Sequence, residues 1–302
     1  MSKYSENYRT YIYTVELPVK IRARDYLVEY CNYSSRLVRK IKREGDILVN
    51  GQKVTLSYLV AKGDKLIIYL GEEDIDAEPE NIPTTIVHED EDILVLNKDP
   101  GFVTHATLGH PTGNLANAIA YHWKNTGVQA KIRFVNRLDR DTSGIIVIAK
   151  NKFAHQFIQD EMKENKVEKI YWAIVEGAVQ AEKGTIDAAI GRPYEDSIER
   201  VIMEEGQRAV THYQVIKRFK NHTLIQLQLE TGRTHQIRVH AKGIGHPIIG
   251  DNLYNPHSIE LIQRQALHAK RIKFVHPRTR KMMGFEAELP RDMSDLVVSE
   301  KL

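Results

Sequence analysis

The segment with the clearest chemical potential is a charged loop that runs directly into an apolar stretch. It spans Phe134 to Lys150 and reads FVNRLDRDTSGIIVIAK. Its central carboxylate, Asp139, is flanked by Arg137 and Arg140. The apolar run predicts a buried strand, and loops at strand ends are where rigid scaffolds commonly carry functional groups. An ionised carboxylate here can act as a nucleophile or a base, or it can be part of a well-formed turn.

A second charged segment, LETGRTHQIRVHAKGIGHPIIGD, spans residues 229–251. Its pattern predicts a strand that ends at Glu230, a Thr-Gly turn, and a helix that Thr234 caps and that runs through about Lys242. Arg233 would then lie at the N-terminal end of that helix. If this end faces Asp139, the guanidinium and the helix dipole both favour an ionised carboxylate, although a lone arginine can also hold a surface acid.

Two other chemistries fit the sequence poorly. The string Asp139-Arg140-Asp141-Thr142 resembles the phosphatase motif DxDxT, but its spacing is one residue short and the apolar strand follows the acids instead of preceding them. The chain has 13 histidines, yet it contains neither HExxH nor a Cys/His ligand set, and His235 and His240 are five positions apart on a predicted helix. We therefore expect no phosphatase activity and no metal ion.

Composition indicates a folded protein of a reducing compartment. The 302 residues are 42% hydrophobic, which is enough for one large domain and a small one. The single cysteine, Cys31, cannot form an internal disulfide. No apolar run has the length of a membrane span, and the N-terminal sequence MSKYSENYRTYIY lacks the apolar core of a signal peptide. We expect a cytoplasmic monomer that does not interact with membranes.

Charge divides the chain into two predicted domains joined by an acidic linker. Residues 18–70 hold eleven Lys or Arg and five acids, whereas residues 71–83 hold six acids and no base. The acidic stretch has two prolines and few large apolar residues, as solvated linkers do. We predict an N-terminal tail and a small α+β domain over residues 1–72, a linker over 73–84, and a second domain over 85–302.

The first domain is predicted to contain a basic helix. Ser34 and Ser35 are candidate N-caps for a helix from about Arg36 to Arg43. Four basic residues share one face of this helix, namely Arg36, Arg39, Lys40 and Arg43. Strands are expected over 46–50 and 65–70, with a hairpin turn at Asn50-Gly51. Taken alone, such a charge run is most often a solvated helix face.

The second domain is predicted to be strand-rich α+β, with a mostly antiparallel mixed sheet, because its short connections suit hairpins. Helices are expected over about 115–123 and 152–165, and strands over 86–97, 169–177, 209–219 and 223–229. In the strand KIYWAIVEG, alternation places Tyr171 on one face and Trp172 on the other.

Four stretches, in this order, resemble the RluA-type family of RNA pseudouridine synthases. They are DILVLNKDPGFVTHA, NRLDRDTSGIIVIAK, KIYWAIVEG and ETGRTHQIRVH, followed by QALHAKRIKFVHP. Together they cover nearly all of residues 85–290. The resemblance implies the family's catalytic fold and an isomerase.

Carried over position by position, the resemblance implies a role for four residues. Asp139 becomes the catalytic aspartate, Tyr171 the aromatic that packs against the target uracil, and Arg233 the ionic partner of Asp139. Arg137 is similar to the family residue that helps to fill the gap left by an extruded base.

The chain departs from the family pattern at two places. Asn136 stands where the family usually has His, and Lys98-Asp99-Pro100 stands where it usually has a Lys-Pro pair. Neither departure changes Asp139, Tyr171 or Arg233, so we expect activity to be retained while base extrusion or substrate choice differs.

The first domain resembles the S4-type RNA-binding domain over about residues 18–70. The resemblance is carried by a basic helix followed by GDILVNGQKV, a Tyr and VAKGDKLIIYL. It implies that the basic helix lies on an RNA backbone and supplies affinity without reading base sequence. A second basic stretch, residues 264–281, has seven Lys or Arg and no acid, and we expect it to extend this RNA track.

The reaction implied is the isomerisation of specific uridines to pseudouridine in structured RNA, either ribosomal or transfer RNA. It breaks the C1′–N1 bond, turns the uracil and joins C5 to C1′, so it is redox-neutral and needs no cofactor. One ionised carboxylate is enough, and the sequence leaves open whether it attacks the sugar or abstracts a proton from it. An aromatic face such as Tyr171 would replace the stacking that the uracil loses on leaving the RNA. An RNA-binding protein that kept the fold without activity is the alternative, but binding alone would not require Asp139.

Overall fold

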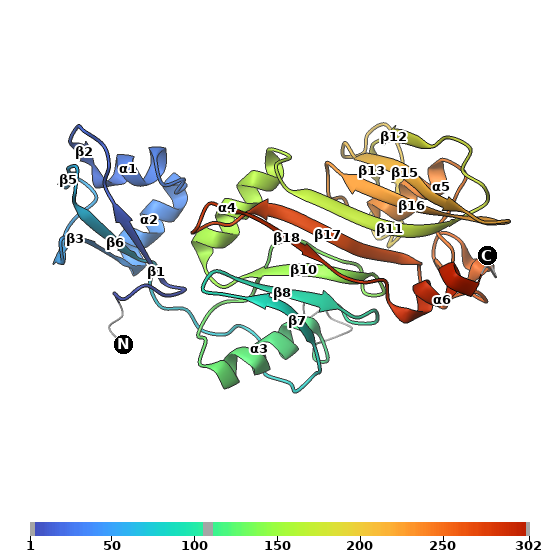
Figure 1. The fold of residues 1–302 in the computed structure, drawn as a ribbon, viewed down its shortest axis with the longest axis horizontal. Helices are drawn as coiled ribbons and strands as arrows, with labels where there is room; N and C mark the ends of the chain where they lie inside the picture. Colours follow the sequence, from blue (N-terminus) through green and yellow to red (C-terminus); the bar gives the residue numbers. More distant parts are fainter. Residues whose placement is uncertain (1–3, 105–110, 300–302) are drawn as a thin grey trace.

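A ten-stranded mixed sheet forms the framework of the larger unit in this computed structural model, which describes residues 4–104 and 111–299 (Figure 1). The strands follow the spatial order β12-β15-β16-β11-β17-β10-β8-β7, with β18 beside β17 and β9 beside β10. Within the described residues every neighbouring pair of this sheet is antiparallel except β10 and β17. The predicted strand-rich α+β fold with a mostly antiparallel mixed sheet is confirmed.

The sheet of this unit contains β7 (Thr85–Glu89), β8 (Ile93–Lys98), β9 (Arg133–Phe134), β10 (Ser143–Ala149), β11 (Glu168–Glu176), β12 (Lys183–Asp187), β15 (Val210–Arg218), β16 (His222–Leu229), β17 (Leu267–Val275) and β18 (Met282–Glu286). A short ribbon is formed by β13 (Ile190–Gly191) and β14 (Val201–Ile202). The helices are α3 (Leu115–Thr126), α4 (Lys152–Lys163), α5 (Gln236–Gly243), the 3₁₀ turn η1 (Pro256–Ser258) and α6 (Arg291–Ser299). The strands β7, β8, β10, β11, β15 and β16 and the helices α3, α4 and α5 were expected from the sequence, whereas β9, β12, β13, β14, β17, β18 and α6 were not.

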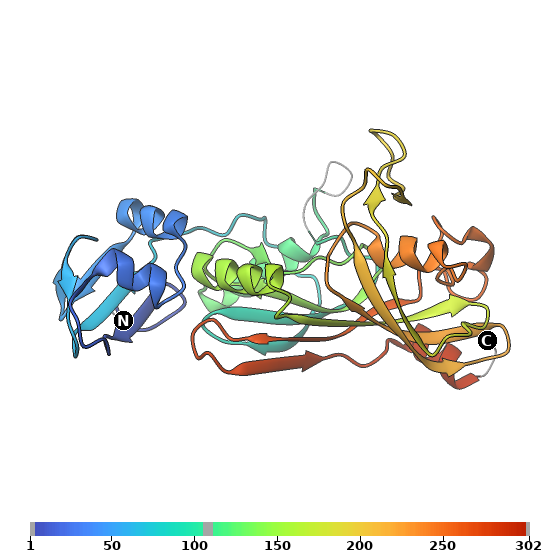
Figure 2. The same ribbon diagram turned by 90° about the horizontal axis from the view of Figure 1, so that it is seen from above.

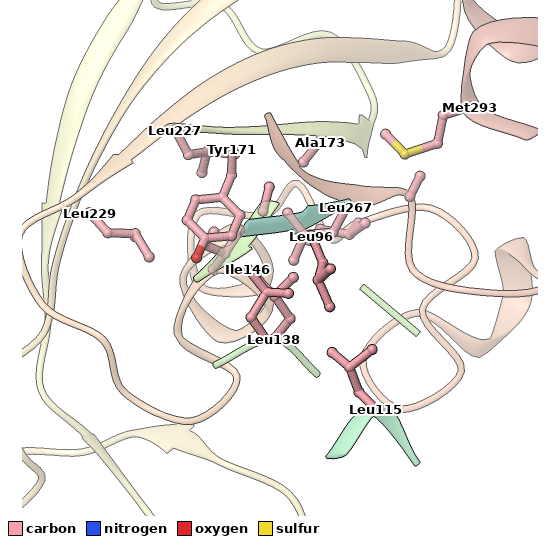
Figure 3. Packing of buried hydrophobic residues seen from close by; sticks show 14 of the residues in the cluster. Leu96, Leu115, Leu138, Ile146, Tyr171, Ala173, Leu227, Leu229, Leu267 and Met293 are labelled. Atoms are coloured by element: carbon pink, nitrogen blue, oxygen red, sulfur yellow. The ribbon is translucent and has the colours of Figure 1, made fainter. Parts of the chain in front are cut away.

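Strand β10 is buried on both faces, as its uninterrupted apolar run predicts. Ile146 belongs to a core cluster that includes Leu96, Leu115 and Leu138 (Figure 3). Val147, on the other face, belongs to a second cluster that includes Phe153 of α4. The strand is therefore held between α3 and α4, and the loop that precedes it has a rigid base.

Gly144 explains why a glycine follows Ser143 at the start of β10. Its φ is 111°, and an added Cβ would lie 2.3 Å from the carbonyl oxygen of Ala269 on β17. This is the point where the parallel pair begins, with Gly144 opposite Ala269. Only a residue without a side chain allows the two backbones to approach this closely.

The N-terminal unit contains a separate four-stranded sheet in the order β1-β6-β3-β4. Its elements are β1 (Thr10–Thr14), β2 (Ile21–Arg22), α1 (Ala23–Glu29), α2 (Ser35–Glu44), β3 (Asp46–Val49), β4 (Gln52–Lys53), β5 (Leu59–Val60) and β6 (Lys65–Tyr69). Ser34 caps α2 by accepting a hydrogen bond from the backbone N–H of Leu37, as predicted. Thr10–Thr14 was expected in an N-terminal tail, but it pairs with β6 along its whole length.

The basic face of α2 is exposed, because its apolar residues Leu37, Val38 and Ile41 are buried beneath it. Lys40 is half-buried, whereas the three arginines on this face are exposed, namely Arg36, Arg39 and Arg43. Figure 2 shows α2, α4 and α5 on the same side of the long sheet. None of the described helices is long and apolar enough to cross a membrane.

The two units share apolar and ionic contacts. Tyr33 stacks on Phe153 with ring centroids 4.2 Å apart, and Tyr11 packs edge-on against the same ring. Arg278 donates to both oxygens of the fully buried Asp92 at 2.6 and 3.0 Å, and to the backbone carbonyl of Thr10 at 2.9 Å. The N-terminal unit is therefore docked on the larger one and not merely tethered to it.

The acidic linker is irregular but fixed along much of its length. Glu73 pairs with Arg133 at 2.6 Å, and Asp76 accepts a hydrogen bond from the backbone N–H of Ile132 at 2.9 Å. Further along, the carboxylate of Glu80 accepts from the N–H of Gly113. The linker is thus less solvated than its composition predicted, because its acids have partners on the larger unit.

Residues 264–281 were expected to extend the RNA track, and several of their seven basic side chains are paired with acids of the fold. Arg264 binds Asp292 at 2.6 Å, and Lys270, which is buried, binds Glu286 at 3.0 Å. Arg278 is occupied by Asp92, as described above. The stretch has no acid of its own, but acids from other segments reach it, so part of its charge is used inside the fold, while Arg280 and Lys281 are exposed.

Candidate active site

A cavity of about 820 Å³ lies where the loop 134–142, the end of β16 and the start of α5 meet. All four side chains that the sequence assigned to the site line it, namely Arg137, Asp139, Tyr171 and Arg233. They come from three segments that lie far apart in the sequence. The predicted site is therefore a single pocket.

Arg238, on the first turn of α5, is the ionic partner of Asp139. Its Nη1 donates to Oδ2 of Asp139 at 3.0 Å, while its Nε and Nη2 donate to the two oxygens of Asp251 at 2.7 and 2.8 Å. Asp251 is fully buried and Arg238 is 5% exposed. Burial opposes the charge of Arg238, but the hydrogen bonds that it donates to Asp251 and Asp139, and the charges of these acids, outweigh burial and raise the pKa of the guanidinium. One arginine thus balances two acids.

The assignment of Arg233 as the partner of Asp139 is wrong in this structure. Arg233 is exposed, and its Nε donates to the backbone carbonyl of Arg208 at 3.0 Å. The helix is capped at His235 and begins at Gln236, one residue later than a Thr234 cap predicts, because His235 takes a left-handed conformation with φ 56°. Arg233 therefore precedes the helix and lies at the rim of the cavity.

The sequence contained a signal that would have found Arg238. It stands in helix α5 between Ile237 and Val239, which are both buried. An arginine inside such a stretch needs acidic partners, because an unpaired buried charge is very costly. Asp139 and Asp251 satisfy that need.

Tyr171, on β11, forms part of the apolar wall of the cavity. It is 8% exposed and lies beside Leu138, Leu227 and Leu229 in Figure 3. The pairing of β11 with β17 is irregular between Ile170 and Trp172, and irregularities of this kind change the direction of a side chain next to active sites. Burial, and then the nearby charge of Asp139, raise the pKa of Tyr171, so it presents a neutral aromatic ring.

Arg137 is exposed at the cavity wall, and no described residue forms an ion pair with it. Its neighbour Asn136 has a structural role. The side-chain amide of Asn136 donates to the carbonyl of Ile145 at 3.1 Å and accepts from the N–H of Val147 at 2.9 Å. This departure from the family pattern therefore attaches the Asp139 loop to β10.

Lys98 attaches the other side of the same loop. Its Nζ donates to the backbone carbonyls of Asp99, Phe102 and Arg140 at 3.0, 3.0 and 2.7 Å. Burial lowers the pKa of Lys98 to about 8. The first sequence stretch thus positions the Asp139 loop through its lysine, while residues 105–106, at the end of that stretch, lie outside the described residues.

Within the described residues, one grouping has the composition of a metal site: Asp90, Asp92 and His276. The carboxylate of Asp92 already accepts hydrogen bonds from Arg278, Tyr11 and Asn151. Asp90 likewise accepts from His88 and His276. The grouping lies between the two units, and its geometry is that of an ion-paired structural cluster.

Comparison with known proteins gives a consistent result. The family model described as RNA pseudouridylate synthase matches residues 92–242. A Bacillus subtilis (strain 168) protein, "uncharacterized RNA pseudouridine synthase YjbO", is 45% identical over 272 residues, covering 88% of this chain and 95% of that protein. The "ribosomal large subunit pseudouridine synthase D" of Buchnera aphidicola subsp. Acyrthosiphon pisum is 38% identical over 281 residues, covering 88% and 90%.

A solved structure agrees with these sequence relatives. The human "RNA pseudouridylate synthase domain containing 1" structure superposes with a TM-score of 0.57 at 25% identity, covering 74% of this chain and 96% of that one.

Proposed function

Because this chain belongs to the RNA pseudouridine synthase family, we propose that it isomerises specific uridines in structured RNA, with Asp139 as the catalytic residue. The observation that carries the proposal is the placement of Asp139 in a cavity beside one buried cation and one neutral aromatic ring. This combination suits a reaction that needs an ionised carboxylate and a flat surface on which a uracil can turn.

Each residue of the cavity has a separate task in this proposal. Arg238 keeps the carboxylate of Asp139 ionised and oriented. Tyr171 offers an apolar face that compensates for the stacking lost when the uracil leaves the RNA. Arg137, which is exposed and free of ion pairs with described residues, is available to occupy the space that the uracil vacates or to bind phosphate.

Both routes for the carboxylate are compatible with this geometry. Among the described residues, side-chain hydrogen bonds reach only Oδ2 of Asp139. Oδ1 is therefore free to attack C1′ of the sugar or to remove a proton from the sugar. In either case the uracil is retained in the pocket, its C5 replaces N1 at C1′ of the sugar, C5 loses its hydrogen as a proton, and N1 gains a proton. Atoms and electrons are conserved, so the reaction is redox-neutral.

The substrate that we propose is ribosomal RNA, with transfer RNA as the second possibility. Support comes from the relatives named as ribosomal large subunit pseudouridine synthase D. Mapping pseudouridines in total RNA from cells with and without this protein identifies the target, and a site in transfer RNA alone would overturn the ribosomal choice.

We also propose that the N-terminal unit is an S4-like RNA-binding domain. Support comes from the exposed basic face of α2, formed by Arg36, Arg39, Lys40 and Arg43, and from the position of α2 on the same side of the long sheet as α4 and α5. Clustered basic residues on a rigid helix bind phosphates by displacing counterions. The unit would supply affinity and orientation and would take no part in the chemistry.

The decisive test is Asp139→Asn. The variant keeps the size of the side chain and removes its charge, so pseudouridine formation in target RNA should become undetectable while RNA affinity stays within about threefold of the parent protein. Asp141→Asn is the matched control, because Asp141 is in the same loop but pairs with Arg140 at 2.9 Å. Turnover by the Asp139 variant at the parental rate would overturn the assignment.

A further inference from the structure

His235 lies in the same cavity, and neither the reaction nor the sequence pattern has given it a task. Its Nε2 is 4.0 Å from Oδ2 of Asp139, and its side chain is 13% exposed. Its backbone is left-handed, with φ 56°, a conformation that few residues other than glycine adopt and that clusters at functional sites. Helix α5 begins at the next residue, and the imidazole of His235 lies between Asp139 and Tyr254.

We propose that His235 is a positioning residue that donates a hydrogen bond from Nε2 to Oδ2 of Asp139 when uridine occupies the cavity. The inference rests on the function proposed above, since it assigns the orientation of the same carboxylate. Its support is the contact that the opposite ring nitrogen, Nδ1, makes with the hydroxyl of Tyr254.

Tyr254 determines which nitrogen of His235 carries the hydrogen. The hydroxyl oxygen of Tyr254 accepts a hydrogen bond from the backbone N–H of Arg200 at 2.8 Å and lies 2.9 Å from Nδ1 of His235. Burial raises the pKa of Tyr254 to about 12, so the hydroxyl keeps its proton at neutral pH. Nδ1 is the one acceptor that the described residues offer to this O–H group. In a neutral imidazole whose Nδ1 accepts, the hydrogen is on Nε2, and Nε2 faces Asp139.

The surroundings favour the neutral ring. Burial is the main cause that lowers the pKa of His235, and Arg238 and Arg200 lower it further, while Asp139 and Asp251 act in the opposite direction. The net shift is downward. A neutral donor beside Asp139 orients the carboxylate without adding a second full positive charge, so the carboxylate keeps its reactivity.

The distance of 4.0 Å is longer than a hydrogen bond, and a small movement closes it. Catalytic hydrogen bonds are often long in the free enzyme and shorten when the substrate binds. Both Arg238 and His235 approach Oδ2, so together they fix the plane of the carboxylate and direct Oδ1 toward the substrate.

The first experiment measures the tautomer directly. Long-range ¹H–¹⁵N correlation spectra of the full-length protein at pH 7, with the spectrum of His235→Gln used for assignment, should show the neutral Nε2–H form of His235. In Tyr254→Phe the preference for this tautomer should weaken. A neutral Nδ1–H form, or a cationic ring at pH 7, would overturn the proposal.

The second experiment compares three substitutions during turnover of target RNA. His235→Asn tolerates the left-handed backbone but has no donor at the Nε2 position, and His235→Ala has no donor at all. Both should lower kcat on the order of tenfold, with KM within about twofold of the parent value. His235→Gln places an amide N–H near the position of Nε2 and should recover most of the rate. His257→Asn is the control, because His257 is exposed on η1.

The outcomes separate this inference from the proposed function. An active parent protein whose His235→Ala variant keeps kcat within twofold overturns the inference alone. Equal losses in the Ala, Asn and Gln variants also overturn it, since a merely structural role does not distinguish a donor at Nε2. A parent protein that forms no pseudouridine overturns the proposed function, and the inference falls with it.

Discussion

Arg238 illustrates how much of the site depends on a single residue. Its guanidinium spans Asp139 and the buried Asp251, which no single-point cation can do. Arg238→Lys should therefore lower kcat/KM on the order of 100-fold, because the ammonium can bind one acid but not hold both in place. Pseudouridine formation in target RNA is the measurement.

Arg233→Lys is the matched control for this change. Arg233 contacts the carbonyl of Arg208 and lies at the rim, so its variant should stay within about fivefold of the parent rate and should mainly weaken RNA binding. The opposite ranking, with Arg233→Lys the more damaging variant, would mean that Arg233 replaces Arg238 at Asp139 when RNA is bound.

The sequence placed the acid and the aromatic residue at the cavity but chose a different cation from the one that pairs with the acid. Asp139 was singled out by its charged loop before an apolar strand, and the role of Tyr171 came from the family resemblance. Both side chains line the cavity, and their roles remain predictions. The cation depended on where α5 begins, and that start is set by the left-handed His235, which no helix-capping preference indicates. Its place before the predicted helix favoured Arg233, whereas the structure brings Arg238, on the first turn of α5, to Asp139.

At the level of elements, the contact between β10 and β17 positions the Asp139 loop, and Gly144 permits it. Gly144→Ala should lower the free energy of unfolding by about 3 kcal/mol, since the new Cβ would clash with the backbone of Ala269 and the positive φ adds strain. Gly127→Ala is the control: its φ is also positive, at 75°, but nothing lies within 4 Å of the added Cβ. That variant should lose about 1 kcal/mol. Equal losses in urea denaturation would contradict the clash.

The contact between β10 and β17 also makes the free energy of unfolding depend on pH, through His268 on β17. Its Nε2 donates to the carbonyl of Ala287 at 3.2 Å, and its Nδ1 accepts from the hydroxyl of Ser143 at 2.9 Å. Burial lowers the pKa of His268 to about 4, below the ordinary value of 6.5. Between these values the unfolded chain binds the proton and the folded chain does not, so stability is present above pH 6.5 and is lost as the pH falls toward 4.

The expected loss from His268 between pH 7 and pH 5 is about 2 kcal/mol of unfolding free energy. His268→Gln should remove this part of the pH dependence, as measured by urea denaturation at the two pH values. His257→Gln, at an exposed position, should retain it. A His268 variant with the parental pH dependence would refute the assignment.

Local signals located about half of the elements, and tertiary contacts explain two of the features that they did not indicate. The capped helix α2, the Asn50-Gly51 turn and the apolar β10 each carry their pattern within a few residues. Strand β1 has a polar, tyrosine-rich sequence that pairs with β6 more than fifty residues later, so no local pattern marks it. The ion pairs of the basic stretch 264–281 escaped the local pattern for the same reason, because its acidic partners come from other segments.

On the scale of the whole molecule, the docking of the N-terminal unit determines how the RNA binding proposed for this unit can be tested. Removing residues 1–80 would expose Phe153 and leave Asp92 without Tyr11, so a truncated protein would lose stability as well as basic surface. Substitution of exposed arginines on α2 removes basic surface without this loss of stability. The triple variant Arg36→Gln, Arg39→Gln, Arg43→Gln should weaken RNA binding on the order of tenfold and reduce its dependence on salt concentration, without changing the melting temperature.

A control of equal charge is available in the same unit. Lys20, Lys62 and Lys65 are exposed and lie outside α2, and their combined change to Gln should alter the RNA dissociation constant by less than about threefold. Equal losses in both triple variants would show that net charge, and not the face of α2, determines affinity.

The contact between Arg278 and the N-terminal unit also sets an order of events during translation. The ribosome makes Thr10 268 residues before it makes Arg278, whose guanidinium binds the Thr10 carbonyl. Domains generally fold from the N-terminus as the chain emerges, so the first unit can form early. Its docking would bury the carboxylate of Asp92, and this is unfavourable until the guanidinium arrives. We therefore expect nascent chains to hold the basic helix loosely, and to acquire a fixed distance between that helix and the cavity only when synthesis has passed Arg278.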